Sequence, residues 1–117
     1  MTILLLEDET LIALDLQYAL EAAGHSVTAL SSNQAAYAWL DDNTPSAAII
    51  DLKLRDGDSR ALADRLANSQ IPMVIYTGHD IENTDLAASL HQVPILKKPA
   101  DQEGIVATLH AQLAAVA

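Results

Sequence analysis

Three acidic side chains and one lysine stand where metal and phosphate chemistry is feasible. Glu7 and Asp8 follow one short apolar run, Asp51 follows another, and Lys98 comes two residues after a third. Carboxylates held close together repel, and at an effective dielectric constant of about 20 each pair of charges about 4 Å apart costs about 4 kcal/mol. A cation must balance them. Mg²⁺ fits because it prefers carboxylate oxygens and can bridge to a phosphate oxygen, and Lys98 supplies a second positive charge.

Each of these residues alone also has an ordinary structural explanation. Acidic residues after a strand, such as Glu7 and Asp8, often cap the next helix, and a hydroxyl before a glycine, as in Thr77-Gly78, is typical of a turn. Asp51 resists such an explanation, since it follows Ala-Ala-Ile-Ile at the edge of a predicted buried sheet, where isolated charge is costly. The combination favours one shared site.

Five short apolar runs predict the strands that position these residues, and apolar spacings of three and four predict the helices. The predicted strands cover residues 3–6, 27–30, 47–50, 73–76 and 93–96. The predicted helices cover residues 12–23, 36–40, 62–66 and 105–116, with Gly24 as the stop of the first and Ser32, Ser59 and Asp101 as N-caps of the others. A further helix over residues 80–91 fits the pattern only loosely.

Strand and helix alternate five times, which predicts an α/β fold with a doubly wound five-stranded parallel sheet and helices on both faces. The length suits one domain over residues 1–117. Ligands of such sheets bind at the carboxyl ends of the strands. The five candidate site residues, Glu7, Asp8, Asp51, Thr77 and Lys98, all lie at predicted strand ends.

Composition narrows the classes of function. A net charge of −10 disfavours nucleic acids and anionic membrane surfaces. The absence of cysteine excludes a disulfide framework, a thiolate metal site and a cysteine nucleophile. No apolar run approaches the roughly 20 residues of a membrane span, and no secretory signal opens the chain, so we expect a cytoplasmic protein. His25, His91 and His110 show no ligand spacing and predict no zinc site, and His79 is expected to be an ordinary loop histidine.

The motifs Leu-Leu-Leu-Glu7-Asp8-Glu9, Thr77-Gly78 and Lys98-Pro99, with the strand before Asp51, resemble the CheY-like receiver domains of bacterial two-component response regulators. The resemblance spans the whole chain and implies the flavodoxin-like (βα)5 receiver fold. It also implies that Lys98 and Pro99 are joined by a cis peptide bond, which in folded proteins is a feature of X-Pro bonds.

The same resemblance implies the roles of the site residues. Glu7, Asp8 and Asp51 would bind Mg²⁺, or Mn²⁺ as an alternative, together with the backbone carbonyl of Lys53. Asp51 would accept a phosphoryl group from a phosphohistidine. Two further residues would hold that group in place, Lys98 by pairing with its oxygens and Thr77 by hydrogen-bonding one of them.

Several positions depart from the usual receiver pattern. Ile95 stands where many receivers carry a switch aromatic, and the chain has no phenylalanine. The loop after Asp51 lacks the usual proline. These features are similar to the single-domain FAT GUY subgroup, found in alphaproteobacteria and often paired with HWE-type histidine kinases. This chain departs from the subgroup pattern at two places: Ile75-Tyr76 stands in place of the usual Phe-Ala before Thr-Gly, and Ala100 stands in place of the usual Phe after Pro.

The sequence therefore predicts a free-standing response regulator, not a turnover enzyme, that serves a sensor histidine kinase or a histidine phosphotransfer protein and an unidentified downstream protein. We expect no direct contact with nucleic acid or membrane, a monomer, and a segment over residues 77–90 that reorganises on phosphorylation. One alternative is a degenerate receiver that binds partners without phosphorylation. Another is a magnesium phosphatase of the haloacid dehalogenase type, which needs a second aspartate where Lys53 stands.

Overall fold

The computed structural model describes residues 2–78 and 86–115 and shows one five-stranded sheet with the strand order β2-β1-β3-β6-β7. Every neighbouring pair of strands is parallel. The strands are β1 (Thr2–Leu6), β2 (Ser26–Leu30), β3 (Ala47–Asp51), β6 (Met73–Thr77) and β7 (Ile95–Lys97). From β1 the chain adds β2 on one side and then β3, β6 and β7 on the other side. This order confirms the predicted doubly wound sheet.

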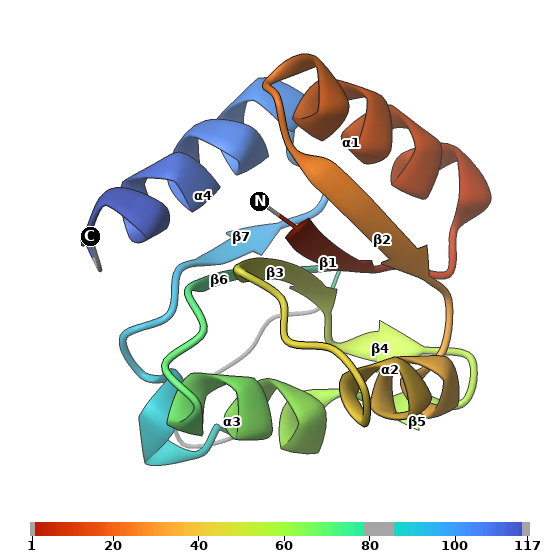
Figure 1. Cartoon of the computed structure of the whole chain (residues 1–117), viewed down its shortest axis with the longest axis vertical. Helices are drawn as coiled ribbons and strands as arrows, with labels where there is room; N and C mark the ends of the chain where they lie inside the picture. The colour runs from red at the N-terminus through yellow and green to blue at the C-terminus, as the bar shows by residue number, and fades with distance from the viewer. Residues whose placement is uncertain (1, 79–85, 116–117) are drawn as a thin grey trace.

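Helices cover both faces of this sheet, as Figure 1 shows. One face carries α1 (Thr10–Ala22) and α4 (Gln102–Ala115), and the other carries α2 (Asn33–Leu40) and α3 (Arg60–Asn68). None of these helices is both long enough and apolar enough to cross a bilayer, a finding that covers residues 2–78 and 86–115.

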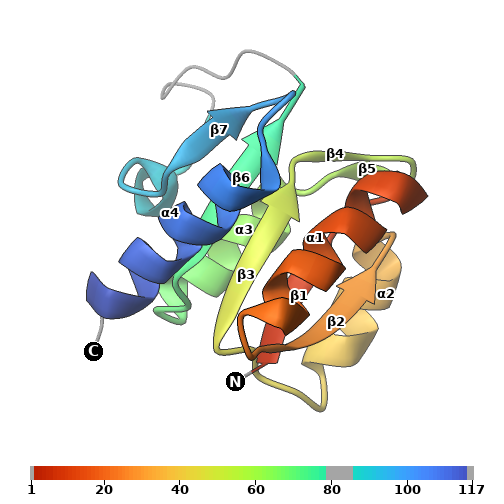
Figure 2. The same cartoon turned by 90° about the horizontal axis from the view of Figure 1, so that it is seen from above.

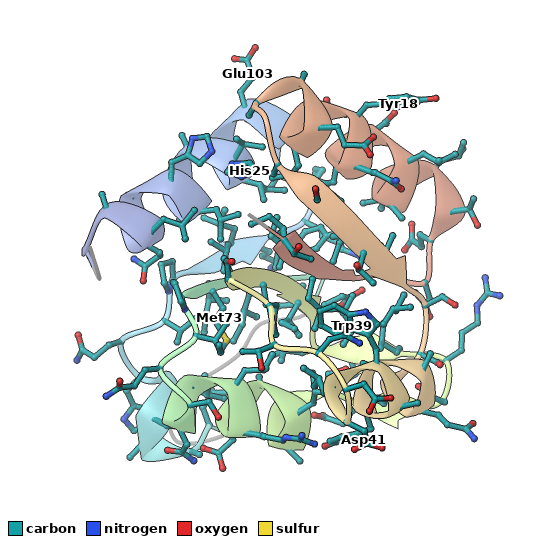
Figure 3. The ribbon with its side chains drawn as sticks, viewed as in Figure 1. Tyr18, His25, Trp39, Asp41, Met73 and Glu103 are labelled. Carbon is teal, nitrogen blue, oxygen red and sulfur yellow. The ribbon has the colours of Figure 1, made fainter. Side chains whose placement is uncertain are left out.

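The two faces hold separate apolar clusters because successive side chains of a strand point to opposite sides. In β1, Ile3 and Leu5 pack with α1 and α4, whereas Leu4 and Leu6 pack on the side of α2 and α3. The central strands β1, β3 and β6 are buried, but the edge strands β2 and β7 are only partly buried, which corrects the prediction that all five apolar runs form buried strands. Figure 3 shows Trp39 directed from α2 toward the sheet, whereas Tyr18 projects outward from α1.

Two of the predicted helix N-caps are confirmed and one is wrong. The Ser32 hydroxyl accepts a hydrogen bond from Ala35 N at 3.1 Å, and Asp101 Oδ1 accepts one from Gly104 N at 2.5 Å. The Ser59 side chain makes no capping hydrogen bond.

At the start of α3 the neighbouring residue replaces the predicted serine. Asp58 Oδ1 accepts from Arg60 N at 2.7 Å, because a carboxylate at this position reaches the free N–H groups of the first helical turn. The stop of α1 is as predicted, since Gly24 has a φ of 95°, a conformation that glycine adopts without steric cost.

The fourth crossover differs from the prediction. Residues 79–85, including His79, lie outside the described part of the chain, and residues 86–91 contain the short 3₁₀ helix η2 (Ala88–Leu90) instead of an α-helix. The Ser89 hydroxyl donates to Asp64 and ties η2 to α3. The strand β7 begins later than predicted because Pro94 has no N–H to donate, although its carbonyl accepts from Ile75 N.

The loop after β3 folds into a small antiparallel hairpin that the sequence did not predict. It consists of β4 (Lys53–Leu54) and β5 (Gly57–Asp58). The Asp56 carboxylate at its turn accepts hydrogen bonds from Asn33 N at 3.0 Å and Gln34 N at 3.1 Å, at the start of α2. These hydrogen bonds lower the pKa of Asp56. The hairpin is therefore anchored on α2 beside the carboxyl ends of β1 and β3.

Both chain ends lie at one end of the sheet in Figure 2, and the arrowheads of β3 and β6 point toward the opposite end. The candidate site residues lie at this opposite end, at or just after the carboxyl ends of the strands.

The Asp56 anchor can be tested with Asp56→Ala. We expect the variant to lower the melting temperature by a few degrees at pH 7, because two N–H groups at the start of α2 lose their acceptors. A lowered carboxyl pKa stabilises the fold above the unfolded value near 3.9, and that stabilisation is lost as pH falls through the lower folded pKa. The difference in melting temperature between Asp56→Ala and wild type should therefore become smaller at acidic pH.

Thermal unfolding followed by circular dichroism at pH 7 and below pH 4 measures this effect. Asp42→Ala is the matched control, since Asp42 is exposed beyond α2 and its carboxylate has no hydrogen-bond partner among the described residues. Equal losses in the two variants would contradict the anchor.

Candidate functional site

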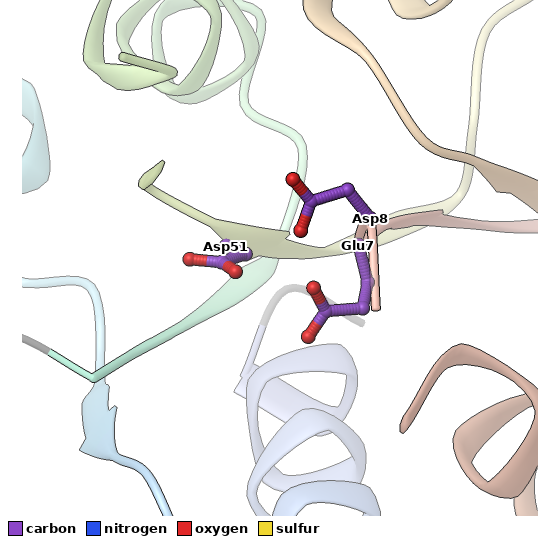
Figure 4. Close-up of side chains that lie close together, drawn as sticks. All are labelled: Glu7, Asp8 and Asp51. Carbon is purple, nitrogen blue, oxygen red and sulfur yellow. The ribbon is translucent and has the colours of Figure 1, made fainter. Parts of the chain in front are cut away.

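Three carboxylates meet at the carboxyl ends of β1 and β3. Glu7 and Asp8 directly follow β1, Asp51 ends the adjacent strand β3, and each offers a ligand oxygen within 4.8 Å of the others. Figure 4 shows the Glu7 and Asp8 carboxylates leaving the chain in different directions, with the Asp51 carboxylate across from both. The sequence prediction that adjacent strands bring these acids together is confirmed.

Glu7 is a buried charge, with 2% of its surface exposed, and both of its oxygens are engaged. Oε1 accepts from the Lys98 ammonium at 2.8 Å and from the Tyr76 hydroxyl at 2.6 Å. Oε2 accepts from Glu9 N at 3.2 Å. Charge-assisted bonds of this kind are the strong class of hydrogen bond, so Glu7 is held by side chains from β6 and from the end of β7.

Lys98 is the cation that the sequence predicts for this site. Its Nζ lies 2.8 Å from Glu7 Oε1 and 3.0 Å from Asp51 Oδ2, and a longer contact of 3.9 Å reaches Glu9. Its side chain is only 16% exposed. The cis bond expected between Lys98 and Pro99 is present. One ammonium therefore bridges two buried carboxylates from neighbouring strands.

Asp8 is held from the other side, by the hairpin after β3. Its Oδ2 accepts from Arg55 N at 2.8 Å, and the Arg55 guanidinium lies 3.9 Å away. The unpredicted hairpin thus supplies a backbone donor to the third acid, and Asp56 anchors the same turn on α2. The local fold fixes Asp8 by contacts that a linear motif does not reveal.

Burial and pairing act in opposite directions on the titrating groups. Burial raises the pKa of Asp51 above its ordinary value, although hydrogen bonds from Lys53 N and Lys98 oppose the rise. Burial would also raise the pKa of Glu7, but hydrogen bonds from Lys98 and Tyr76 bring it below the usual range. Burial disfavours the charged form of Lys98, yet its two carboxylate partners raise the Lys98 pKa. Asp51 is the least compensated charge of the three.

The other two predicted site residues lie on the same edge. Lys53 N donates to Asp51 Oδ1 at 3.1 Å, while the predicted role of the Lys53 carbonyl as a metal ligand stays a prediction. Thr77 is fully buried at the end of β6, and its carbonyl accepts from Lys98 N at 2.8 Å. The predicted contact of the Thr77 hydroxyl with a phosphoryl oxygen also stays a prediction.

Sequence reasoning missed Tyr76 as a member of the site. Its position in an apolar run made it a core residue, and it does belong to the cluster beneath α1 and α4. Its hydroxyl nevertheless reaches Glu7, and the Lys98 Nζ lies 4.9 Å from the centre of its ring. The only sequence signal was a tyrosine directly before Thr77.

A second missed contact joins two histidines far from this edge. His25, just before β2, and His110 of α4 have their Nε2 atoms 2.9 Å apart. No spacing pattern links two residues that are 85 positions apart. Partial burial and the neighbouring His110 lower the pKa of His25.

The donor set at the strand ends fits a small divalent cation. The three carboxylates offer only hard oxygen ligands, which suit Mg²⁺ or Mn²⁺. Within the described residues this is the one group of three acidic, histidine or cysteine side chains close enough to share an ion. The Lys98 ammonium alone leaves the cluster with excess negative charge.

Comparison with known proteins places this site in a family context. Residues 3–110 match the family model described as response regulator receiver domain. Curated relatives include the acid tolerance regulatory protein ActR of Rhizobium meliloti, 30% identical over 92% of this chain and 57% of the relative. The phyllosphere-induced regulator PhyR of Methylorubrum extorquens is 33% identical over 66% of this chain and 30% of the relative. The chain thus spans about a third to three fifths of these relatives.

Solved structures show the same fold. A response regulator receiver protein from Sinorhizobium medicae has a TM-score of 0.83 and 26% identity, covering 97% of this chain and 94% of the other. A CheY-like receiver domain protein from Methanospirillum hungatei has a TM-score of 0.86 at 20% identity, covering 97% and 94% of the two chains.

The excess negative charge predicts how Asp51→Asn affects stability. The raised pKa of Asp51 means that its charged form costs stability above the unfolded pKa near 3.9, a cost that fades as pH falls through the folded pKa. At pH 7 in EDTA we expect the variant to melt higher than wild type by on the order of 5 °C. MgCl₂ should raise the melting temperature of the wild type more than that of the variant.

Scanning calorimetry of both proteins in EDTA and in MgCl₂ measures the two effects. Asp15→Asn, an exposed aspartate of α1, is the control for removal of one charge. A melting temperature of Asp51→Asn at or below that of wild type in EDTA would refute the charge imbalance.

Proposed function

The chain belongs to the family of response regulator receiver domains, and from this premise we propose that Asp51 accepts a phosphoryl group in a magnesium-dependent reaction that switches partner binding. The observation that carries the proposal is the contact of Lys98 Nζ with Asp51 Oδ2 at 3.0 Å, beside the carboxylates of Glu7 and Asp8. An acceptor oxygen, a fixed cation and a set of metal ligands lie within one small volume.

The family takes part in two-component signalling, in which receiver domains work with histidine kinases or phosphotransfer proteins. For this chain the donor would be a sensor histidine kinase, of the HWE type if the FAT GUY resemblance holds, or a histidine phosphotransfer protein. The signal would leave through a downstream protein. We place the protein in the cytoplasm as a monomer.

In the proposed transfer, one Asp51 oxygen forms a bond to phosphorus while the phosphorus–nitrogen bond of the phosphohistidine breaks. The electron pair of that bond stays with the imidazole nitrogen. Lys98 moves with the developing charge from the Asp51 oxygen to the equatorial phosphoryl oxygens, and Thr77 donates its hydroxyl to one of them. Positioning and neutralisation of charge are most of what phosphoryl transfer requires.

Glu7, Asp8, Asp51 and the Lys53 carbonyl would hold the divalent cation. Bound there, Mg²⁺ supplies positive charge next to the transferred group. The hairpin keeps Asp8 in place through Arg55 N, and Glu9 N with Tyr76 orients Glu7. These contacts arrange the acids before any donor arrives.

The product would be an acyl phosphate, which is labile to water and so makes the switch reversible. The chain would act as a phosphoacceptor with slow self-dephosphorylation and not as a turnover enzyme. Ile95 of β7 is aliphatic, so the readout would not use an aromatic side chain at that position. Reorganisation of residues 77–90 stays a prediction, since residues 79–85 lie outside the described part.

Labelling experiments test the acceptor directly. With candidate kinases and labelled ATP, or with labelled acetyl phosphate, we expect label on the wild type and none on Asp51→Asn. EDTA should abolish labelling because the acidic cluster then lacks its cation. Equal label on wild type and Asp51→Asn would sink the assignment. Phosphorylation-independent binding of the same downstream partner would instead support a degenerate receiver.

The role of Lys98 can be separated from that of charge in general. We expect Lys98→Ala to slow labelling about 100-fold at saturating Mg²⁺, because one preorganised donor to the transferred group is lost. Lys97→Ala, the adjacent and exposed lysine, should label at the wild-type rate. Rapid-quench kinetics with acetyl phosphate gives both rates, and similar rates for the two variants would remove Lys98 from the mechanism.

A further inference from the structure

Tyr76 belongs to β6, the strand between β3, which ends in the phosphoacceptor, and β7, which leads to Lys98. In the sheet its Cα is paired with Asp51 of β3 on one side and with Leu96 of β7 on the other. The side chain enters the cluster beneath α1 and α4 and is 2% exposed. A residue buried in this way on a strand needs no hydroxyl, yet this one places its oxygen on the edge that carries the acids.

The tyrosine contacts both members of the central ion pair. Its hydroxyl donates to Glu7 Oε1 at 2.6 Å, a length typical of an O–H donor to a carboxylate. Its ring lies under the Lys98 ammonium, with Nζ 4.9 Å from the ring centre, within the range of a cation–π contact. One side chain thus contacts the Glu7 carboxylate through its hydroxyl and the Lys98 ammonium through its ring.

The two donors to Glu7 Oε1 differ in what phosphorylation does to them. Lys98 also contacts Asp51 Oδ2, so a phosphoryl group on Asp51 would draw the ammonium away from Glu7. Glu7 is buried, and a buried carboxylate oxygen that loses its donor is costly. The Tyr76 hydroxyl is an uncharged phenol donor, so a new negative charge on Asp51 does not draw it away, and it can stay on Oε1 when Lys98 leaves.

We propose that Tyr76 is a positioning residue of the phosphoacceptor site: its hydroxyl fixes Glu7 for the divalent cation and frees Lys98 to follow the phosphoryl group. This inference rests on the function proposed above. Fixing of a ligand by an outer hydrogen bond is a general feature of metal sites, and loss of such a bond typically weakens metal binding by about 10- to 100-fold.

Packing alone does not account for the tyrosine. Tyr76 lines an open pocket of about 410 Å³ together with Ile12, Leu16, Ala100 and Ile105. Tyr76→Phe keeps the ring and removes only the oxygen, so it separates the hydrogen bond from the packing.

The test compares wild type, Tyr76→Phe and the control Tyr37→Phe, a tyrosine exposed on α2. Mg²⁺ affinity is measured by isothermal titration calorimetry, and labelling by acetyl phosphate is timed at saturating Mg²⁺. We expect Tyr76→Phe to bind Mg²⁺ about 10-fold more weakly and to label more slowly even when saturated. Tyr37→Phe should match wild type in both measurements.

A double-mutant cycle shows whether Tyr76 acts through Glu7. In a Glu7→Gln background, adding Tyr76→Phe should change Mg²⁺ affinity by less than about twofold. The Glu7 carboxylate that the Tyr76 hydroxyl positions is then absent, so removal of the hydroxyl has little further effect. A full 10-fold effect in that background would overturn the inference.

Wild-type protein offers a measurement that needs no Tyr76 variant. The hydroxyl proton of a short buried hydrogen bond exchanges slowly and gives a downfield proton resonance, which Tyr18→Phe and Tyr37→Phe should leave in place. We expect it to persist when Mg²⁺ and beryllofluoride are added. Loss of this resonance when Mg²⁺ and beryllofluoride are added would overturn the role of Tyr76. A Mg²⁺ affinity and a labelling rate of Tyr76→Phe equal to those of wild type would overturn it as well. No label on the wild type would instead overturn the proposed function and leave the Mg²⁺ comparison standing.

Discussion

The site depends on one electrostatic constraint, the gathering of three carboxylates at the buried edge of a parallel sheet around a single ammonium. Glu7 and Asp51 are almost fully buried and share Lys98, whereas Asp8 relies on a backbone donor from the hairpin. Pairing with one cation cannot neutralise three anions, so the fold retains a place for further positive charge. In the proposed function, the same imbalance that costs stability would prepare Asp51 and its neighbours for a metal and a phosphoryl group.

The sheet and its reactive edge could be predicted from sequence because their signals are local. In a pattern that alternates strands and helices, a run such as Ala47 to Ile50 is interpreted as a buried parallel strand. The carboxyl ends of parallel strands then meet at one edge of the sheet. Asp51 and Lys98 were found in that way. Contacts set by packing alone were not, since neither the Arg55 N bond to Asp8 nor the His25–His110 contact has a linear signature. The loosely patterned residues 80–91 were the weakest prediction, and their described part is not an α-helix.

Two positions at which the sequence departs from the FAT GUY pattern line one pocket, although 24 positions separate them in the chain. Tyr76 stands where that pattern has alanine, and Ala100 where it has phenylalanine, and the pocket lies beside α1 and α4. The Tyr76 side chain brings a hydroxyl to Glu7, which neither alanine nor phenylalanine can supply.

The position of that aromatic ring determines which face of the domain can sense Lys98. Ile95 packs on the side of α2 and α3, whereas Tyr76 packs on the side of α1 and α4. Because the Lys98 ammonium lies against the Tyr76 ring, any movement of Lys98 toward a group on Asp51 removes a contact from the ring. In the proposed function, a change at Asp51 would therefore reach the α1 and α4 face through the contact of Lys98 with Tyr76, without an aromatic side chain at Ile95.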